Sequence, residues 1–200
     1  MADIRVYLEQ GQRWVFAAAI DWPGWCRRAK GEHEALEALE EYRARYAAVV
    51  AARRVVGRLH VVGTVPGDMY TDFGAPGSLG PWDDDVMTKA SRRRQIDLLE
   101  DCWRYFDDVV ASSSPTLRKG PRGGGRDRDG VANHVREAER AYAAKAGARV
   151  APRTPWPEQR RLIVSGLESG VQTRWPTGYA IRRIAWHVLD HAWEIEDKRD

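Results

Sequence analysis

The amino-acid sequence predicts an α+β protein in which a small N-terminal β-β-β-α-β domain precedes a four-helix bundle. Three observations lead to this fold class. Apolar residues alternate with a period of two near the N-terminus, as in strands, and recur every three or four residues over most of 83–200, as in amphipathic helices. Between these regions, 63–82 is rich in glycine and proline and follows neither period. We therefore expect two folding units, 1–62 and 83–200, joined by a linker over 63–82.

The elements of the first unit are short. Alternation over residues 4–8 and again over 14–20 predicts a β-hairpin. Residues 25–29 are expected to add a short edge strand. A helical period then extends over 32–54, and residues 59–62 form a last strand. This order of elements gives the β-β-β-α-β domain.

The second unit is helical almost throughout. The apolar period predicts a first helix over 83–110, with the aspartates at 83–85 in its first turn, where negative charge interacts favourably with the helix dipole. A second helix is expected over 129–146. The third extends over 157–170, beginning with a proline suited to a first turn and ending at a glycine suited to a C-terminal cap. The fourth covers 178–198, and four such helices favour a bundle.

Composition excludes several classes of protein. With 43% hydrophobic and 30% charged residues, the chain can bury a core and still solvate its surface. The longest apolar run, 14–20, is far shorter than the roughly 20 residues that cross a bilayer, and the N-terminus lacks the apolar core of a secretion signal. We expect a cytoplasmic protein with no membrane partner. The 32 basic and 29 acidic residues are too balanced to indicate nucleic acid as a partner.

Cysteines and histidines decide what kind of metal site the chain can form. The two cysteines, Cys26 and Cys102, belong to different predicted units, so neither a disulfide scaffold nor a Cys-rich zinc site is available. On the last helix His187 and His191 lie four residues apart, so both project from one face, where the apolar arc meets solvent. His134 shares the apolar face of the second helix. These three histidines are candidate ligands of one divalent ion. The alternative is that they bind no metal, in which case His134 is a hydrogen-bonded core histidine and His187 and His191 make ordinary surface contacts.

Two segments of the second unit resemble a known family. The segment 182–197 is similar to the closing helix of the DinB-like superfamily, and 133–139 resembles its second helix. Members of that superfamily are four-helix bundles that commonly bind a divalent metal through one histidine of the second helix and an H-x-x-x-H pair of the fourth. The superfamily includes isomerases and transferases that use mycothiol, bacillithiol or glutathione. The resemblance implies that His134, His187 and His191 hold the metal and that a small electrophilic substrate reacts with a thiol.

The first unit resembles a HicB-type antitoxin domain. The similarity rests on the hairpin, on residues 23–26, on Gly31 and on 34–36 at the start of the helix. HicB-type antitoxins usually continue into a DNA-binding module, whereas this chain continues into a predicted bundle. The resemblance therefore implies a domain that binds a partner or joins two copies in a homodimer.

Other residues are candidates for supporting roles. Arg122 and Arg126 lie in a basic, glycine-rich loop before the second helix, where they could bind the carboxylate of a thiol cofactor or a substrate, the alternative being a solvated loop. Asp190 and Glu194 flank the histidine pair and could orient an imidazole or act as a base, the alternative being a solvated charged edge.

Aromatic residues are candidates for contacts between the parts of the chain. Tyr70, Phe73 and Trp82 could pin the linker to both units. Trp186 and Trp193 fall on the side of the last helix opposite the histidines. They are therefore expected to pack against another element.

Three functional hypotheses follow. The leading one is a metal- and thiol-dependent transferase or isomerase that acts on a small molecule, with zinc as the default ion because three neutral imidazoles suit it, and with nickel or iron also accepted. A metal-dependent hydrolase is the second, and it would use Asp190 or Glu194 as base. The third is a non-catalytic binding or stress-associated protein whose HicB-like domain recognises a partner.

Overall fold

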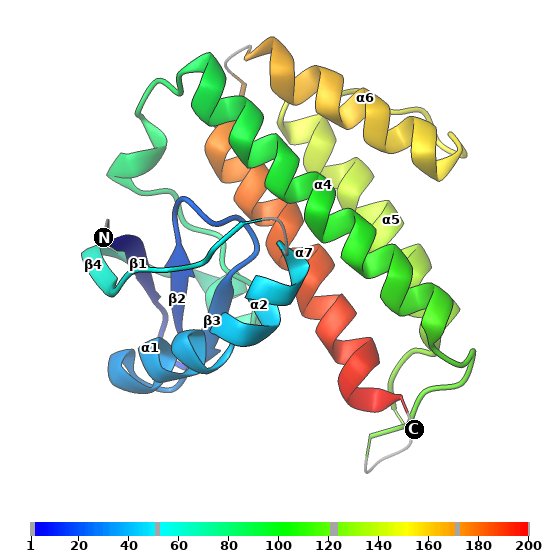
Figure 1. The fold of residues 1–200 in the computed structure, drawn as a ribbon, viewed down its shortest axis with the longest axis horizontal. Helices are drawn as coiled ribbons and strands as arrows, with labels where there is room; N and C mark the ends of the chain where they lie inside the picture. Colours follow the sequence, from blue (N-terminus) through cyan, green and yellow to red (C-terminus); the bar gives the residue numbers. More distant parts are fainter. Residues whose placement is uncertain (1–2, 51–52, 121–123, 171–172, 200) are drawn as a thin grey trace.

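A computed structural model describes residues 3–50, 53–120, 124–170 and 173–199 (Figure 1). It confirms a mixed α+β chain, with a four-stranded sheet near the N-terminus followed by long helices. The strands are β1 (Ile4–Gln10), β2 (Val15–Ala19), β3 (Cys26–Ala29) and β4 (Leu59–Pro66), and the α-helices are α1 (Glu32–Glu41), α2 (Arg43–Val49), α3 (Met69–Phe73), α4 (Lys89–Ser112), α5 (Arg128–Lys145), α6 (Trp156–Ser169) and α7 (Thr177–Lys198).

The sheet has the strand order β3-β2-β1-β4. β1 and β2 form the predicted antiparallel hairpin, β3 pairs antiparallel with β2, and β4 returns parallel to β1 after the crossover through α1 and α2. The helix expected over 32–54 is two helices, because α1 ends at Glu41 and α2 begins at Arg43. The predicted order of strands and helix is therefore confirmed, with the helix divided.

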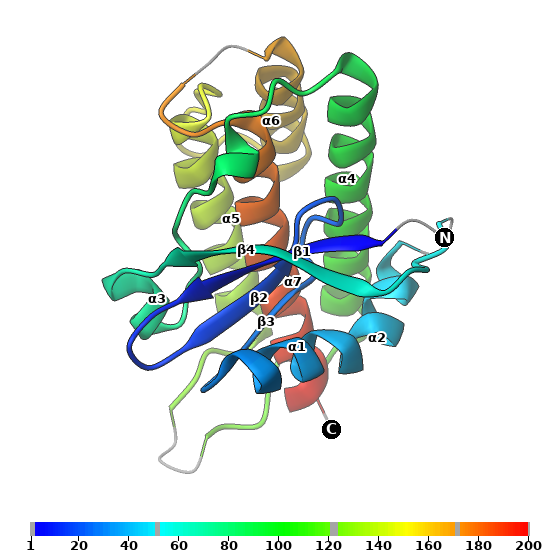
Figure 2. The ribbon, with the colours of Figure 1, turned by 90° about the vertical axis from the view of Figure 1, so that its left-hand side faces the viewer.

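Both faces of the sheet are covered. Side chains alternate along β2, so Ala17 belongs to the cluster that includes α1 and α2, whereas Phe16 lies in the cluster that receives Trp186 of α7. Figures 1 and 2 show α7 between the sheet and the other long helices. The ring of Trp186 meets Phe16 edge-on at 6.3 Å, and Trp193 meets Tyr42 at 5.0 Å. Both tryptophans thus pack against another element, as the helical phase indicates.

The segment expected to be a linker contains regular structure. β4 extends to Pro66, and α3 follows from Met69, capped by Asp68. The apolar pattern predicts only the first half of this strand, 59–62, because most of its residues are exposed at the edge of the sheet. Of the aromatic candidates only Trp82 packs, 4.8 Å from the ring of Tyr7, while Tyr70 and Phe73 are 60% and 93% exposed. The segment 63–82 therefore contains the end of a strand and a short helix, which its composition did not predict.

The first bundle helix begins later than its acidic residues suggest. α4 starts at Lys89, and the Thr88 hydroxyl accepts a hydrogen bond from the Ser91 amide at 3.1 Å. Asp83 instead ends a 3₁₀ turn, Pro81–Asp83, and forms a buried ion pair with Arg182 of α7. A buried guanidinium needs a carboxylate partner, so this contact accounts for the position of Asp83 better than the helix dipole does.

The four long helices α4 to α7 pack against one another as predicted. α6 ends at Ser169 and is capped by Gly170, whose φ of +63° is the left-handed conformation expected of a glycine cap. One cluster of buried residues runs from Leu8 of the sheet through Trp25 and Cys102 to Ile184 of α7. The sheet and the bundle therefore share a core. The two independent folding units predicted from the sequence remain untested, and the shared core leads us to expect one cooperative unfolding transition instead. Among the described helices, none combines the length and apolar character that crossing a bilayer requires.

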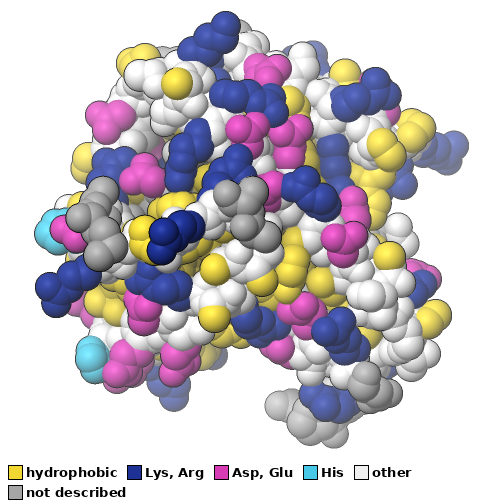
Figure 3. Space-filling view, in the orientation of Figure 1, with side chains coloured by type: hydrophobic (Ala, Val, Ile, Leu, Met, Phe, Trp, Pro, Cys, Tyr) yellow, Lys and Arg dark blue, Asp and Glu magenta, His cyan; other side chains and the backbone are white. Residues whose placement is uncertain are grey.

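Charges of both signs are mixed on the surface over α4. In Figure 3, which has the orientation of Figure 1, Lys and Arg side chains are interspersed with Asp and Glu side chains on the upper part of the molecule. Arg93 illustrates the pattern, because it forms ion pairs with Asp97, Glu100 and Glu168. Such pairing leaves little net field on this face.

Candidate metal centre

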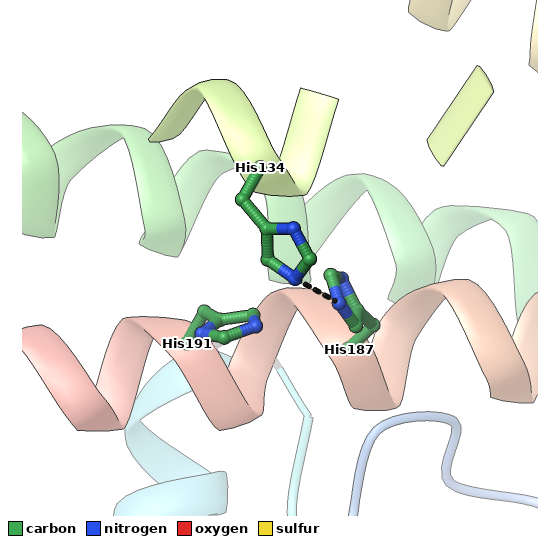
Figure 4. A group of neighbouring side chains, drawn as sticks. All are labelled: His134, His187 and His191. Atoms are coloured by element: carbon green, nitrogen blue, oxygen red, sulfur yellow. Dashed lines mark hydrogen bonds between the residues drawn. The ribbon is translucent and has the colours of Figure 1, made fainter. Parts of the chain in front are cut away.

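The structure brings the three predicted histidines together. His187 and His191 lie one turn apart on α7, and His134 reaches them from α5, which packs alongside (Figure 4). The ring centroids are 4.6 Å apart for His187 and His191, and 5.0 Å apart for His134 and each of the other two. One ring nitrogen of each residue lies within 4.8 Å of the other two. They are therefore close enough to bind one metal ion.

The distance between the ligand nitrogens of His134 and His187 fits a tetrahedral ion. The Nε2 atoms of His134 and His187 are 3.2 Å apart. Zinc–imidazole bonds of about 2.0–2.1 Å at tetrahedral angles separate two ligand nitrogens by about 3.3–3.4 Å. Without an ion this contact needs a proton on one of the two rings, since two nitrogen lone pairs facing each other repel. The pair is thus spaced as a shared ligand site requires.

Burial keeps two of the three imidazoles, those of His187 and His134, in the form that binds metals. His187 is 7% exposed, and burial, together with the like charges that His191 and His134 would carry, lowers its pKa to about 2. Burial also lowers the pKa of His134, with His191 the next cause. Only a neutral imidazole offers its lone pair to an ion. At neutral pH the imidazole of His187 is therefore neutral and can coordinate a metal ion.

Glu194 orients one of the imidazoles. The Nδ1 atom of His191 donates a hydrogen bond to Oε2 of Glu194 at 2.7 Å, and Lys198 donates to the other carboxylate oxygen. The hydrogen bond from His191 is the main reason that the pKa of Glu194 falls to about 2. A carboxylate that holds Nδ1–H fixes the tautomer in which Nε2 is free for an ion. Of the two predicted roles for Glu194, this geometry supports orientation.

Asp190 is engaged elsewhere. Its carboxylate accepts a hydrogen bond from Arg27 of β3 at 3.4 Å, and within the described residues no hydrogen bond joins it to a histidine. Arg27 in turn lies over the ring of Tyr42, at 3.9 Å from the centroid. Asp190 therefore connects α7 to the sheet, and the structure does not place it as an orienting group or a base for the three histidines.

The structure describes only one of the two arginines predicted to bind an anion. Arg122 lies outside the described residues. Arg126 is exposed and close enough to the centre that its charge contributes to the lowered pKa of both His134 and His187. No carboxylate pairs with Arg126 in the part of the chain that the structure describes. Its predicted role in binding an anion stays open.

Sequence reasoning missed two neighbours of His187. Tyr142 of α5 meets its ring edge-on, with 5.6 Å between centroids, and Arg183 precedes it by one turn of α7. The sequence does contain a signal for Arg183. It precedes His187 by four residues, as His187 precedes His191, so all three residues share one face of the helix. Nδ1 of His187 is buried and has no hydrogen-bond partner among the described residues. The protein thus fixes the tautomer of His191 and leaves that of His187 unassigned.

The sequence matches no family model, and comparisons with curated proteins and with solved structures gave no match. The resemblances to the DinB-like superfamily and to HicB-type antitoxins therefore stay predictions. The assignment of a candidate metal centre rests on the positions of the three histidines.

Proposed function

We propose that this protein is a metal-dependent enzyme of the DinB-like type that transfers or isomerises a small electrophilic substrate with the help of a low-molecular-weight thiol such as mycothiol. The observation that carries the proposal is the convergence of His134, His187 and His191 from two helices. Structural zinc sites usually have four protein ligands, whereas three ligands at the border of the core leave a position for a reactant. Three histidines in this place are therefore better suited to catalysis than to holding the fold.

Zinc is the ion that these ligands favour. Three neutral imidazoles provide borderline-soft nitrogen ligands, and zinc accepts them in a tetrahedral arrangement. Nickel and ferrous iron bind imidazole as well, so metal analysis decides among the three. When bound, such an ion supplies a positive charge that stabilises a thiolate at neutral pH.

The surrounding carboxylates favour a thiol over water as the nucleophile. A hydrolase that uses a carboxylate as its general base would have a free carboxylate near the histidines to take a proton from water. Glu194 is occupied by His191 and Lys198, and Asp190 pairs with Arg27. A thiol that coordinates a divalent ion loses its proton without a protein base, so this arrangement of side chains suffices for thiol chemistry. A metal-dependent hydrolase remains the second candidate.

Metal analysis of the intact, untagged chain tests the proposal. We expect about one divalent ion per chain, and the double variant His187→Ala, His191→Ala should lose it. The matched control replaces His33 and His60, the two histidines outside the centre, both of which are exposed. Metal content should be unchanged in that control.

Two results would contradict the proposal. The first is wild-type protein that carries no stoichiometric metal and takes up neither Zn²⁺ nor Ni²⁺. The second is equal metal content in the site variant and the control. Either result would favour the non-catalytic alternative, in which the N-terminal domain recognises a partner and the bundle is a scaffold.

A further inference from the structure

Arg183 is held next to the candidate metal centre by two aromatic rings. Its guanidinium carbon lies 4.6 Å from the centroid of the Trp186 ring and 5.2 Å from that of Tyr142. Both rings also contact His187, at centroid distances of 5.9 and 5.6 Å. Stacking on two rings restricts a long side chain that would otherwise be mobile. The guanidinium is therefore positioned beside the histidines.

Among the residues that the structure describes, this guanidinium has no counterion. Nη1 of Arg183 is buried and makes no hydrogen bond to any described residue, and no carboxylate pairs with the side chain there. Its neighbour Arg182 faces the sheet side and forms a buried ion pair with Asp83. A buried guanidinium N–H without an acceptor is costly, so its presence indicates a group that supplies one.

A second cation lies on the same side of the centre. Nζ of Lys145, at the end of α5, lies 4.6 Å from the centroid of the Trp175 ring, and Trp175 packs against Tyr142 at 5.5 Å. Partial burial, followed by the charges of Arg174 and Arg183, holds the pKa of Lys145 below its usual value. In the described segments neither Lys145 nor Arg174 is paired with a carboxylate. Positive charge is thus concentrated and not neutralised here.

We propose that Arg183 and Lys145 form a subsite for a carboxylate, which belongs to a ligand whose other end reaches the three histidines. This inference rests on the proposed metal centre and adds the charge class of its substrate or thiol. A carboxylate matches the donors of a guanidinium and an ammonium group, and the aromatic rings behind them lower the local dielectric constant and strengthen the contact. The residues differ from Arg122 and Arg126, which precede α5.

The spacing on α7 sets the length of the ligand. Arg183 and His187 are four residues apart on the helix, which is about 6 Å along its axis. A thiol and a carboxylate separated by two methylene groups span a similar distance. 3-Mercaptopropionate is therefore a suitable probe, and its methyl ester is the matched probe without the charge.

Cobalt-loaded, full-length protein allows the binding of each probe to be measured directly. Cobalt(II) takes the place of zinc and absorbs light when a thiolate coordinates it, so titration with each probe gives a dissociation constant without any enzymatic assay. We expect the acid to bind more tightly than the ester. Two separate variants, Arg183→Met and Lys145→Met, remove one charge each. Each variant should bind the acid about tenfold more weakly than wild type does and should bind the ester with unchanged affinity, as expected for the loss of one charge-assisted contact. Arg58→Met, at an exposed arginine before β4, is the control.

The outcomes separate this inference from the proposed function. Equal affinity of acid and ester in wild-type protein that binds cobalt would overturn the carboxylate subsite and leave the metal centre intact. The same conclusion follows if the acid keeps its affinity in both variants. Wild-type protein that binds none of cobalt, zinc and nickel would overturn both proposals. Because Lys145 is exposed, its variant remains informative if Arg183→Met does not fold.

Discussion

Nδ1 of His191 donates a hydrogen bond to the carboxylate of Glu194 across 2.7 Å, one turn along α7. Because an ionised carboxylate can only accept, the contact places the proton on Nδ1 and turns Nε2 toward His134 and His187. Orienting carboxylates of this kind commonly change metal affinity by 10- to 100-fold.

Glu194→Ala should therefore weaken zinc binding by about 10- to 100-fold, because the imidazole of His191 loses its orientation. Glu194→Gln, which keeps an acceptor oxygen, should weaken it less. Competition with a chromogenic chelator measures both affinities. Glu37→Ala is the matched control, since Glu37 pairs with the exposed His33 at 3.2 Å, outside the centre. Unchanged zinc affinity in Glu194→Ala would refute an orienting role.

Metal-free protein should lose stability between pH 7 and pH 5. The pKa of His187 is about 2 in the folded chain, where the ring is buried, and about 6.5 when unfolded, so acid protonates the unfolded state first. The free energy of unfolding at pH 5 should therefore be about 2 kcal/mol lower than at pH 7. The pKa of His134 is also lowered, so its titration should reduce stability further over the same pH range. Urea denaturation at the two pH values measures the difference.

His187→Gln provides the control for this pH dependence. The variant lacks the titrating ring, so the loss of stability between pH 7 and pH 5 should be clearly smaller. The titration of Glu194 does not affect this comparison. The hydrogen bond from His191 lowers the pKa of Glu194 to about 2, so Glu194 changes the free energy of unfolding only as pH falls below about 4.5. Equal pH dependence in the two proteins would show that His187 is not buried in its neutral form.

Removing the metal should lower the thermal midpoint at neutral pH. An ion bound by His134 and His187 joins α5 to α7, and at a free concentration 100 times Kd it adds about 2.7 kcal/mol to stability. For a chain of this size that corresponds to a shift of about 5–10 °C. Melts with and without chelator, after metal analysis, give the shift. Equal midpoints would mean that the apolar stripes alone hold the bundle.

Phe16→Ala should destabilise the sheet and the bundle together. Phe16 is fully buried on β2 and meets Trp186 of α7, so its removal should cost about 3–5 kcal/mol. Because the core is continuous from Leu8 to Ile184, we expect far-UV circular dichroism and tryptophan fluorescence to report one coincident transition at a lower midpoint. Two separate transitions would instead support two independent folding units on either side of 63–82.

Local patterns were sufficient to predict most of the fold. The period of two in β1 and β2 and the helical period in α4 to α7 are local properties, and the glycine cap at Gly170 is a local conformation. The end of β4 was not predictable in this way. Its pairing with β1 depends on a crossover of many residues, and its exposed edge leaves no alternating pattern. The beginning of α4 was missed because Asp83 is bound by a distant arginine.

The sequence by itself determined that His187 and His191 share one face of a helix, since the helical repeat places residues four apart side by side. Only the tertiary structure decided that His134 meets them, because that contact depends on how α5 docks against α7. Docking also buries His187 and so lowers its pKa. The docking of α7 also gives Glu194 and Asp190 different roles. Both flank the histidines in sequence, but α7 turns one toward His191 and the other toward Arg27 of the sheet.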